Sequence, residues 1–129
     1  MEPAKGKRVT VMVADDNDDV RRLFGLQLRA LGYLVVEAAN GQEALELARQ
    51  SPPSLILMNI HMPVLDGLAA TRAIRDSEEL RNTAIVAYSS YPSGLTRERA
   101  LTAGCNEYVP RRECVDQLPS IVRLFADRS

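Results

Sequence analysis

The chain has no large excess of charge of one sign, no long apolar run and no apolar stretch at its start. Each of these absences excludes a class of protein. The 129 residues carry 16 basic and 17 acidic side chains, so the formal net charge is −1. No basic patch is interleaved with aromatic residues, which excludes the electrostatic footprint of a nucleic-acid-binding protein. No apolar run approaches the roughly 20 residues of a membrane span, and the first residues lack the apolar stretch of a signal peptide. We therefore expect a cytoplasmic protein that binds neither nucleic acid nor membrane.

Cysteine is too scarce for a disulfide framework. The chain has only Cys105 and Cys114, and they form no Cys-x-x-Cys pattern. We predict that both are small buried hydrophobic side chains, with a redox or metal-binding role as the less favoured alternative.

The sequence does contain a strict alternation of short apolar runs with segments of helical periodicity. The apolar runs lack a polar face, as strands covered on both sides do. The expected strands are 9–14, 34–36, 55–58, 85–88 and 108–109. The expected helices are 18–31, 41–50, 68–76, 96–103 and a last one that begins at 115 or 116 and carries Leu118, Ile121, Val122 and Phe125.

Five strands and five helices in alternation predict an α/β fold, in which helices cover both faces of a parallel sheet. Residues 1–7 are expected to form a flexible N-terminal arm, and residues 8–129 a single domain. Parallel sheets bind ligands beyond the carboxyl ends of their strands. The polar residues that follow the expected strands are therefore the candidate site: Asp15, Asp16, Asn59, Ser89, Ser90, Arg111 and Arg112.

Five segments of the chain together resemble the receiver domain of two-component response regulators, from about Arg8 onward. They are VADDNDDVRRLF, AANGQEALELARQ, LILMNIHMPVLDG, IVAYSS and GCNEYVPRR, in the order and position of that family. The resemblance implies a flavodoxin-like, three-layer fold with strand order 2-1-3-4-5. It also implies phosphorelay signal transduction, in which an aspartate at the tip of the third strand receives a phosphoryl group from a kinase histidine.

The same resemblance assigns roles to individual residues. Asp15 and Asp16 match the acidic pair that holds Mg²⁺, and His61 matches the position whose backbone carbonyl also ligates the metal. Ser89 matches the hydroxyl residue that contacts the phosphoryl group, and Tyr108 the aromatic residue whose rotation reports activation. The side chain of His61 is expected to be exposed.

Three positions depart from the family pattern. Asn59 stands where the family has its phosphoacceptor aspartate, and Arg111 and Arg112 stand where it has a lysine and a proline. A neutral amide is not a nucleophile, so we expect direct phosphorylation at Asn59 to fail.

The departures also affect metal binding. We expect weak Mg²⁺ binding by oxygen atoms of Asp15, Asp16, Asn59 and the His61 carbonyl, because one ligand charge is lost. Arg111 is expected to pair with a carboxylate of the acidic pair, and the 111–112 peptide bond is expected to be trans.

The leading hypothesis is an atypical single-domain receiver, not an enzyme, that acts as a phosphorylation-independent interaction module. Its partner would be a histidine kinase or another signalling protein, docked on the face of the fourth and fifth helices, and the protein would be a monomer or a weak dimer. This face carries Tyr91, Arg97, Arg99, Tyr108, Arg111 and Arg112.

Two other functions compete with this hypothesis. One is a functional phosphoacceptor receiver that carries an introduced Asp-to-Asn change at position 59. The other, a flavodoxin-like enzyme with a phosphate-bearing cofactor, is disfavoured because the acidic loop DDNDD repels phosphate.

Overall fold

Five parallel strands form one sheet in the order β2-β1-β3-β4-β5. The structure is a computed structural model that describes residues 9–90 and 96–127. The strands are β1 (Thr10–Ala14), β2 (Leu34–Ala38), β3 (Leu55–Asn59), β4 (Ala84–Tyr88) and β5 (Glu107–Tyr108). The predicted α/β class and strand order are confirmed. The expected N-terminal arm and Tyr91 lie outside the described residues.

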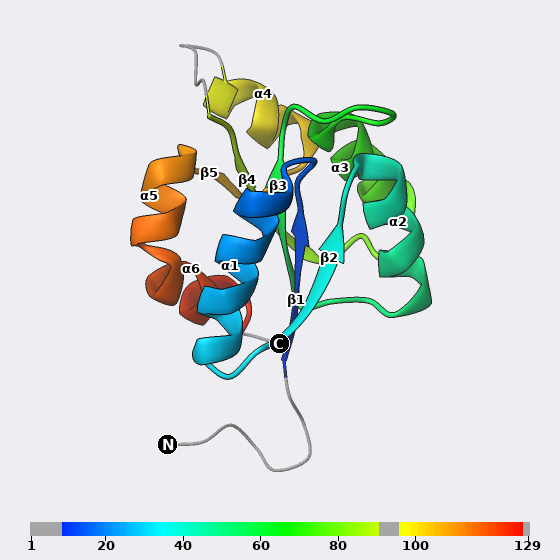
Figure 1. The fold of residues 1–129 in the computed structure, drawn as a ribbon. Coiled ribbons are helices and arrows are strands. Elements are labelled where there is room, and N and C mark those ends of the chain that lie inside the picture. Colours follow the sequence, from blue (N-terminus) through cyan, green and yellow to red (C-terminus); the bar gives the residue numbers. More distant parts are fainter. Residues whose placement is uncertain (1–8, 91–95, 128–129) are drawn as a thin grey trace.

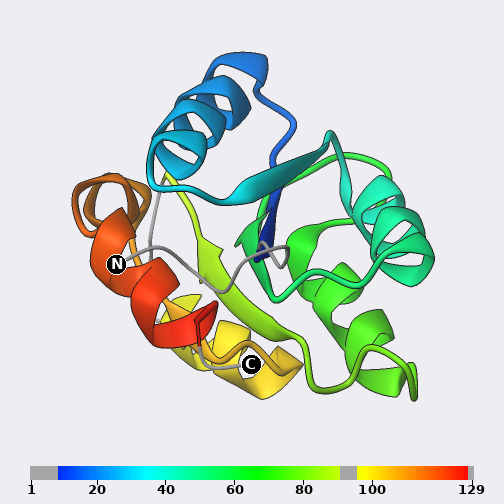
Figure 2. The same cartoon turned by 90° about the horizontal axis from the view of Figure 1, so that it is seen from below.

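Helices cover both faces of this sheet, as Figures 1 and 2 show. They are α1 (Asp18–Ala30), α2 (Gly41–Gln50), α3 (Gly67–Asp76), α4 (Thr96–Ala103), α5 (Arg111–Asp116) and α6 (Leu118–Phe125). Among residues 9–90 and 96–127, no helix combines the length and the apolar character needed to cross a bilayer.

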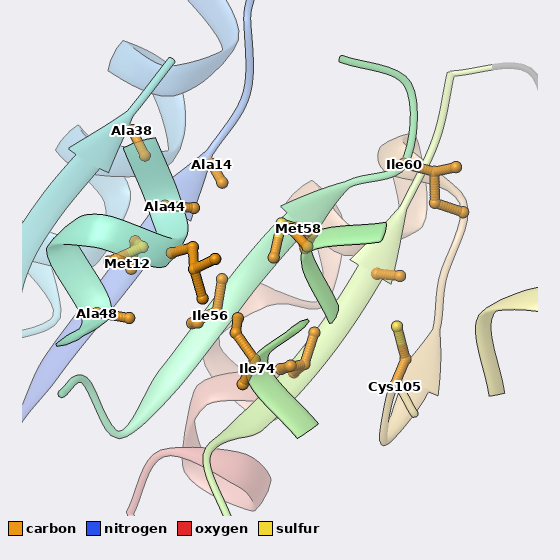
Figure 3. Close-up of a cluster of buried hydrophobic side chains, with 14 of the residues drawn as sticks. Met12, Ala14, Ala38, Ala44, Ala48, Ile56, Met58, Ile60, Ile74 and Cys105 are labelled. Carbon is orange, nitrogen blue, oxygen red and sulfur yellow. The ribbon is translucent and has the colours of Figure 1, made fainter. Parts of the chain in front are cut away.

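Alternation along the strands divides the buried side chains into two clusters. Val11 and Val13 of β1 and Leu57 of β3 point toward α1, α5 and α6, where they pack with Phe24 and Leu118. The intervening residues of the same strands point toward α2, α3 and α4. Figure 3 shows part of this second cluster, which includes Met12, Ala44, Ala48, Ile56 and Ile74. Cys105 and Cys114 are both buried and unpaired, one in each cluster, as the prediction of small buried side chains required.

Side-chain caps explain where three of the helices begin. Asn17 accepts hydrogen bonds from the backbone N–H groups of the first turn of α1, and Asn40 and Asp66 do the same for α2 and α3. Such caps satisfy N–H groups that have no partner within the helix. After α1, Gly32 has a φ of +97°, the left-handed conformation in which a helix commonly ends.

The last part of the chain differs from the prediction, because the described residues form six helices instead of five. Residues 111–116 form a separate helix, α5, and α6 begins only at Leu118. Pro119 has no N–H to donate to the carbonyl oxygen of Val115, so a continuous helix through this point would lose a hydrogen bond. In α6, Pro119 lies in the first turn, where that N–H is not needed.

The two edges of the sheet are unequal. The outer strand β5 has two residues, whereas the opposite edge strand β2 has five. On β2, the Oε1 atom of Glu37 lies 3.3 Å from Nε of Arg21, and its Oε2 atom lies 3.6 Å from Nη2 of Arg29. Both arginines belong to α1, so these ion pairs connect the first helix to the edge of the sheet.

Candidate functional site

The carboxyl ends of β1, β3 and β4 lie side by side, and the candidate residues come at these ends (Figure 1). Asp15 and Asp16 follow β1, Asn59 ends β3, and Ser89 follows β4. Parallel pairing places Asn59 opposite Tyr88. The structure therefore brings Asp15, Asp16, Asn59 and Ser89 to one edge of the sheet.

The two neighbouring carboxylates have different surroundings. Asp15 is only 2% exposed, whereas Asp16 is exposed. The Oδ1 atom of Asp15 accepts a hydrogen bond of 2.8 Å from the backbone N–H of Asn17, and its Oδ2 atom accepts one of 2.6 Å from the hydroxyl of Tyr88. Burial raises the pKa of Asp15 and repulsion from Asp16 adds to the rise, while the two hydrogen bonds oppose it.

Tyr88 is a member of the site that sequence reasoning missed, because it was assigned only as the last residue of an apolar strand. Its side chain is fully buried, and its ring packs against Phe24 with ring centroids 5.3 Å apart. Burial raises the pKa of Tyr88 well above its usual value of 10, so the hydroxyl stays a donor to Asp15. The available signal was the hydroxyl itself, because a buried tyrosine usually finds a hydrogen-bond partner.

The amide of Asn59 lies between two oxygen atoms. Its Nδ2 atom donates a hydrogen bond of 2.9 Å to the backbone carbonyl of His61 and a longer one of 3.4 Å to Oδ1 of Asp16. These two oxygen atoms therefore converge on the amide nitrogen. A carboxylate in place of this amide would face Asp16 with a charge of the same sign, which is unfavourable without a cation. The side chain of His61 is exposed, as expected.

Close backbone contacts fix the loop that follows Asn59. The N–H of Gly67 donates to the carbonyl of Ile60 at 2.8 Å. A Cβ atom on Gly67 would lie only 2.2 Å from the backbone oxygen of Asn59. Gly41 is similar, since a Cβ there would lie 2.1 Å from the backbone oxygen of Leu65. Only glycine fits at these two positions, so the chain packs tightly around the end of β3.

Ser89 and Tyr108 bind each other at the ends of β4 and β5. Their hydroxyl oxygens are 2.7 Å apart, and both side chains are buried. The hydroxyl of Ser89 is therefore engaged within the protein, and the ring of Tyr108 is directed inward instead of toward solvent.

The expected ion pair of Arg111 is not found. Within residues 9–90 and 96–127, Arg111 forms no ion pair with Asp15, Asp16 or any other acid. Its backbone N–H donates to the carbonyl of Ser89 at 3.0 Å, and it is the first residue of α5. Arg111 also lines a surface hollow with Asp19 of α1.

Backbone geometry at the same loop agrees with the prediction. The described residues contain no cis peptide bond, so the Arg111–Arg112 bond is trans.

The oxygen atoms around Asn59 are of the type that Mg²⁺ prefers. The described residues contain no group of three or more His, Cys, Asp or Glu side chains that could hold a metal ion. The carboxylate of Asp16 and the backbone carbonyl of His61 nevertheless approach the Asn59 amide, with Asp15 next to Asp16 in the chain. Rotation of that amide would present its oxygen in place of its nitrogen. The donor set therefore fits a hard cation, with two negative charges and with Asn59 turned over.

Comparison with known proteins identifies the family. The family described as "Response regulator receiver domain" matches residues 11–123. The chain belongs to this family. As a receiver, it is 36% identical over 116 residues to the polar-differentiation response regulator DivK of Brucella anthropi, and the match covers 90% of this chain and 94% of that protein.

Solved receiver structures have the same fold. The receiver domain of a sensor histidine kinase from Pseudomonas aeruginosa, which was solved with a magnesium ion in its active-site cleft, is 32% identical to this chain. The match covers 92% of this chain and 98% of that one with a TM-score of 0.84. The receiver domain of Ssk1 from Saccharomyces cerevisiae, solved with the histidine phosphotransfer protein Ypd1, is similar with 27% identity, a TM-score of 0.85 and coverage of 93% of this chain and 90% of that one. These likenesses place the chain in two-component signalling with a flavodoxin-like fold.

Proposed function

We propose that this receiver is a protein-interaction module that works without phosphorylation, because Asn59 cannot accept a phosphoryl group. The observation that carries the proposal is the position of the Asn59 amide. Its nitrogen donates to Asp16 and to the carbonyl of His61, at the tip of the central strand β3. The module acts by binding and is not an enzyme.

The chemistry of phosphoryl transfer supports this proposal. An aspartate supplies an anionic oxygen as the nucleophile that attacks phosphorus. The lone pairs of an amide are delocalised and it carries no charge, and in Asn59 the N–H side of the amide faces the neighbouring oxygen atoms. An acyl phosphate cannot form directly from this group.

The contact between Ser89 and Tyr108 also supports the proposal. The resemblance assigns Ser89 to the phosphoryl contact and Tyr108 to the report of activation. In this receiver the two hydroxyl groups already bind each other in the interior. The Ser89–Tyr108 hydrogen bond forms without a phosphoryl group. A module that keeps one binding surface at all times needs no phosphoryl group to set this contact.

Mg²⁺ is proposed to bind weakly. Asp15, Asp16, the Asn59 amide oxygen and the His61 carbonyl would hold it, and the ion would neutralise the charge of the two carboxylates. Binding requires the Asn59 amide to turn over and give up its two hydrogen bonds.

The proposed partner is a histidine kinase or another signalling protein that contacts α4 and the last two helices, α5 and α6, which stand in place of the expected fifth helix. Arg97, Arg99 and Arg112 are exposed on these helices, and Leu101 of α4 is 40% exposed. An apolar residue among cationic side chains suits a partner surface of mixed apolar and acidic character. With ¹⁵N-labelled receiver and a purified partner kinase, amide resonances of α4, α5 and α6 should shift while those of α2 stay unchanged. Shifts confined to α2 would reject this face.

The decisive experiment is intact-protein mass spectrometry after incubation with a small-molecule phosphodonor and MgCl₂. The wild-type protein should show no phosphate adduct. The matched control is Asn59→Asp, which restores the carboxylate at nearly constant volume and should gain an adduct, slowly because Arg111 replaces the family's lysine. A stoichiometric adduct on the wild-type protein would refute the proposal.

A further inference from the structure

Tyr88 links the site to the interior of the protein. Its hydroxyl donates to Oδ2 of Asp15 at 2.6 Å, and its ring is fixed by full burial and by contact with Phe24. Both side chains lie on the face of the sheet that α1 covers. Tyr88 comes two residues after Val86, and Asp15 comes two residues after Val13, so each points to the same face as that valine. The hydrogen bond thus spans β3 and connects the end of β4 to the end of β1.

The oxygen atoms expected to hold a cation already have donors from this chain. Oδ1 of Asp15 accepts from the backbone of Asn17, and Oδ2 accepts from Tyr88. Oδ1 of Asp16 and the carbonyl of His61 both accept from the Asn59 amide. Each of these oxygen atoms thus has one of its acceptor directions occupied by a donor of the chain itself.

The donors to Asp15 and Asp16 differ in how easily they can leave. Asn59 is half-buried, and rotation of its amide requires no change in the backbone. Tyr88 cannot rotate without disturbing a close-packed interior, and a short hydrogen bond to a carboxylate is among the stronger ones. Mg²⁺ usually keeps several of its waters. Asp15 is only 2% exposed, so a hydrated ion has no room beside its carboxylate in this position.

We propose that Tyr88 is a positioning residue that keeps Asp15 turned into the protein, so that a divalent cation can use both Asp15 and Asp16 only by breaking the Tyr88–Asp15 hydrogen bond. The proposal deepens the proposed function, since it gives a cause for weak metal binding that is independent of Asn59. Removing the hydroxyl alone should therefore make the acidic pair a better cation site.

The test is Tyr88→Phe, titrated with MgCl₂ and followed by ¹⁵N–¹H spectra. The dissociation constant for Mg²⁺ should fall about tenfold relative to wild type, the order expected when one hydrogen bond to a charged group no longer opposes binding. The matched control is Tyr33→Phe, which removes a hydroxyl that donates to Asp127 at 2.8 Å. Tyr33 precedes β2 at the opposite end of the sheet, so its loss should leave the constant unchanged. An unchanged or weaker affinity in Tyr88→Phe would overturn the proposal.

A second measurement uses the wild-type protein, in case Tyr88→Phe does not fold. With ¹³C-labelled tyrosine, the Cζ resonance of Tyr88 should move in step with Mg²⁺ binding, and that of Tyr33 should not. If the Tyr88 resonance stays in place at saturating Mg²⁺, the hydroxyl has not left Asp15 and the proposal is wrong. A phosphate adduct on wild-type protein would reject the proposed function and leave these two titrations unaffected, so the two failures can be told apart.

Discussion

The hydroxyl groups of Ser89 and Tyr108 bind each other at 2.7 Å in the interior of the receiver. Tyr108→Phe removes this bond and leaves the Ser89 hydroxyl buried without it. We expect a loss of about 1 kcal/mol in the free energy of unfolding, measured by urea denaturation. In a double-mutant cycle with Ser89→Ala, the two changes should couple by about 0.5–1.5 kcal/mol. Simple additivity of the two losses would contradict the contact.

Asn59→Asp should make the stability of the protein depend on Mg²⁺. The change replaces an amide donor by a third carboxylate near Asp15 and Asp16, so with a chelator the free energy of unfolding should fall by about 1–2 kcal/mol. Mg²⁺ should then raise the melting temperature far more than in wild type, because a ligand that binds the folded state stabilises it.

The control for this change is Asn106→Asp. Asn106 precedes β5 at the opposite end of the sheet, and its Oδ1 atom accepts from Arg75 and from the backbone of Ile85. An aspartate keeps this acceptor and adds the same charge, so it should produce no dependence on Mg²⁺. Equal effects of the ion on both variants would show a general response to charge instead of binding at Asn59.

The two cysteine thiols should be inert in the folded protein. Cys114 is fully buried, and burial raises its pKa from 9 to about 12; burial also raises the pKa of Cys105. Because the thiolate is the reactive form, a thiol reagent at pH 8 should label neither residue quickly, and both in urea. Rapid labelling of one thiol without denaturant would contradict the burial.

The raised pKa of Cys114 also sets a pH dependence of stability. Above pH 9 the unfolded chain releases the thiol proton, while the folded protein keeps it until about pH 12. The stability that depends on the protonated Cys114 thiol is therefore fully present below pH 9, and the free energy of unfolding decreases as the pH rises toward 12. Urea midpoints measured from pH 8 upward should fall less steeply in Cys114→Ala than in wild type.

Gly67→Ala should strongly destabilise the protein. The new Cβ atom would lie 2.2 Å from the backbone oxygen of Asn59, so the chain after β3 has to move. We expect a loss of about 2–3 kcal/mol, as for overpacking in a rigid environment. Gly25→Ala is the matched control, since its Cβ would meet the ends of flexible side chains and no backbone atom: Nη1 of Arg29 at 3.0 Å and Oε2 of Glu37 at 3.5 Å. In the interior of α1 that change should be neutral or stabilise by up to about 1 kcal/mol.

Periodicity predicted most of the helices and strands, because this signal is local. The start of α2 at Gly41 and the extent of α4 agree with the structure. The division of the last helix was not predicted, because only Cys114 is fully buried in α5 and so short a helix gives no periodic stripe. Pro119 marks the break, and the predicted helix, which began at 115 or 116, ran through it.

The site was predictable in its location but not in its hydrogen bonds. The ends of parallel strands gather at one edge, so Asp15, Asp16 and Asn59 could be placed together from their positions in the chain. Arg111 is the first residue of α5, a helix that the sequence did not predict. The role of Tyr88 depends on two strands that are separated by β3, and such a contact leaves no local pattern in the sequence.

Among the described residues, nothing pairs with the outer side of the edge strand β2, so a strand of a second molecule could add to its row of backbone groups. Glu37 and the two arginines that it contacts place charges of both signs beside that row. An incoming strand would have to displace or bury them, so these ion pairs protect the protein against edge-to-edge aggregation. The same contacts that hold α1 to the sheet thereby favour a sheet that ends at five strands.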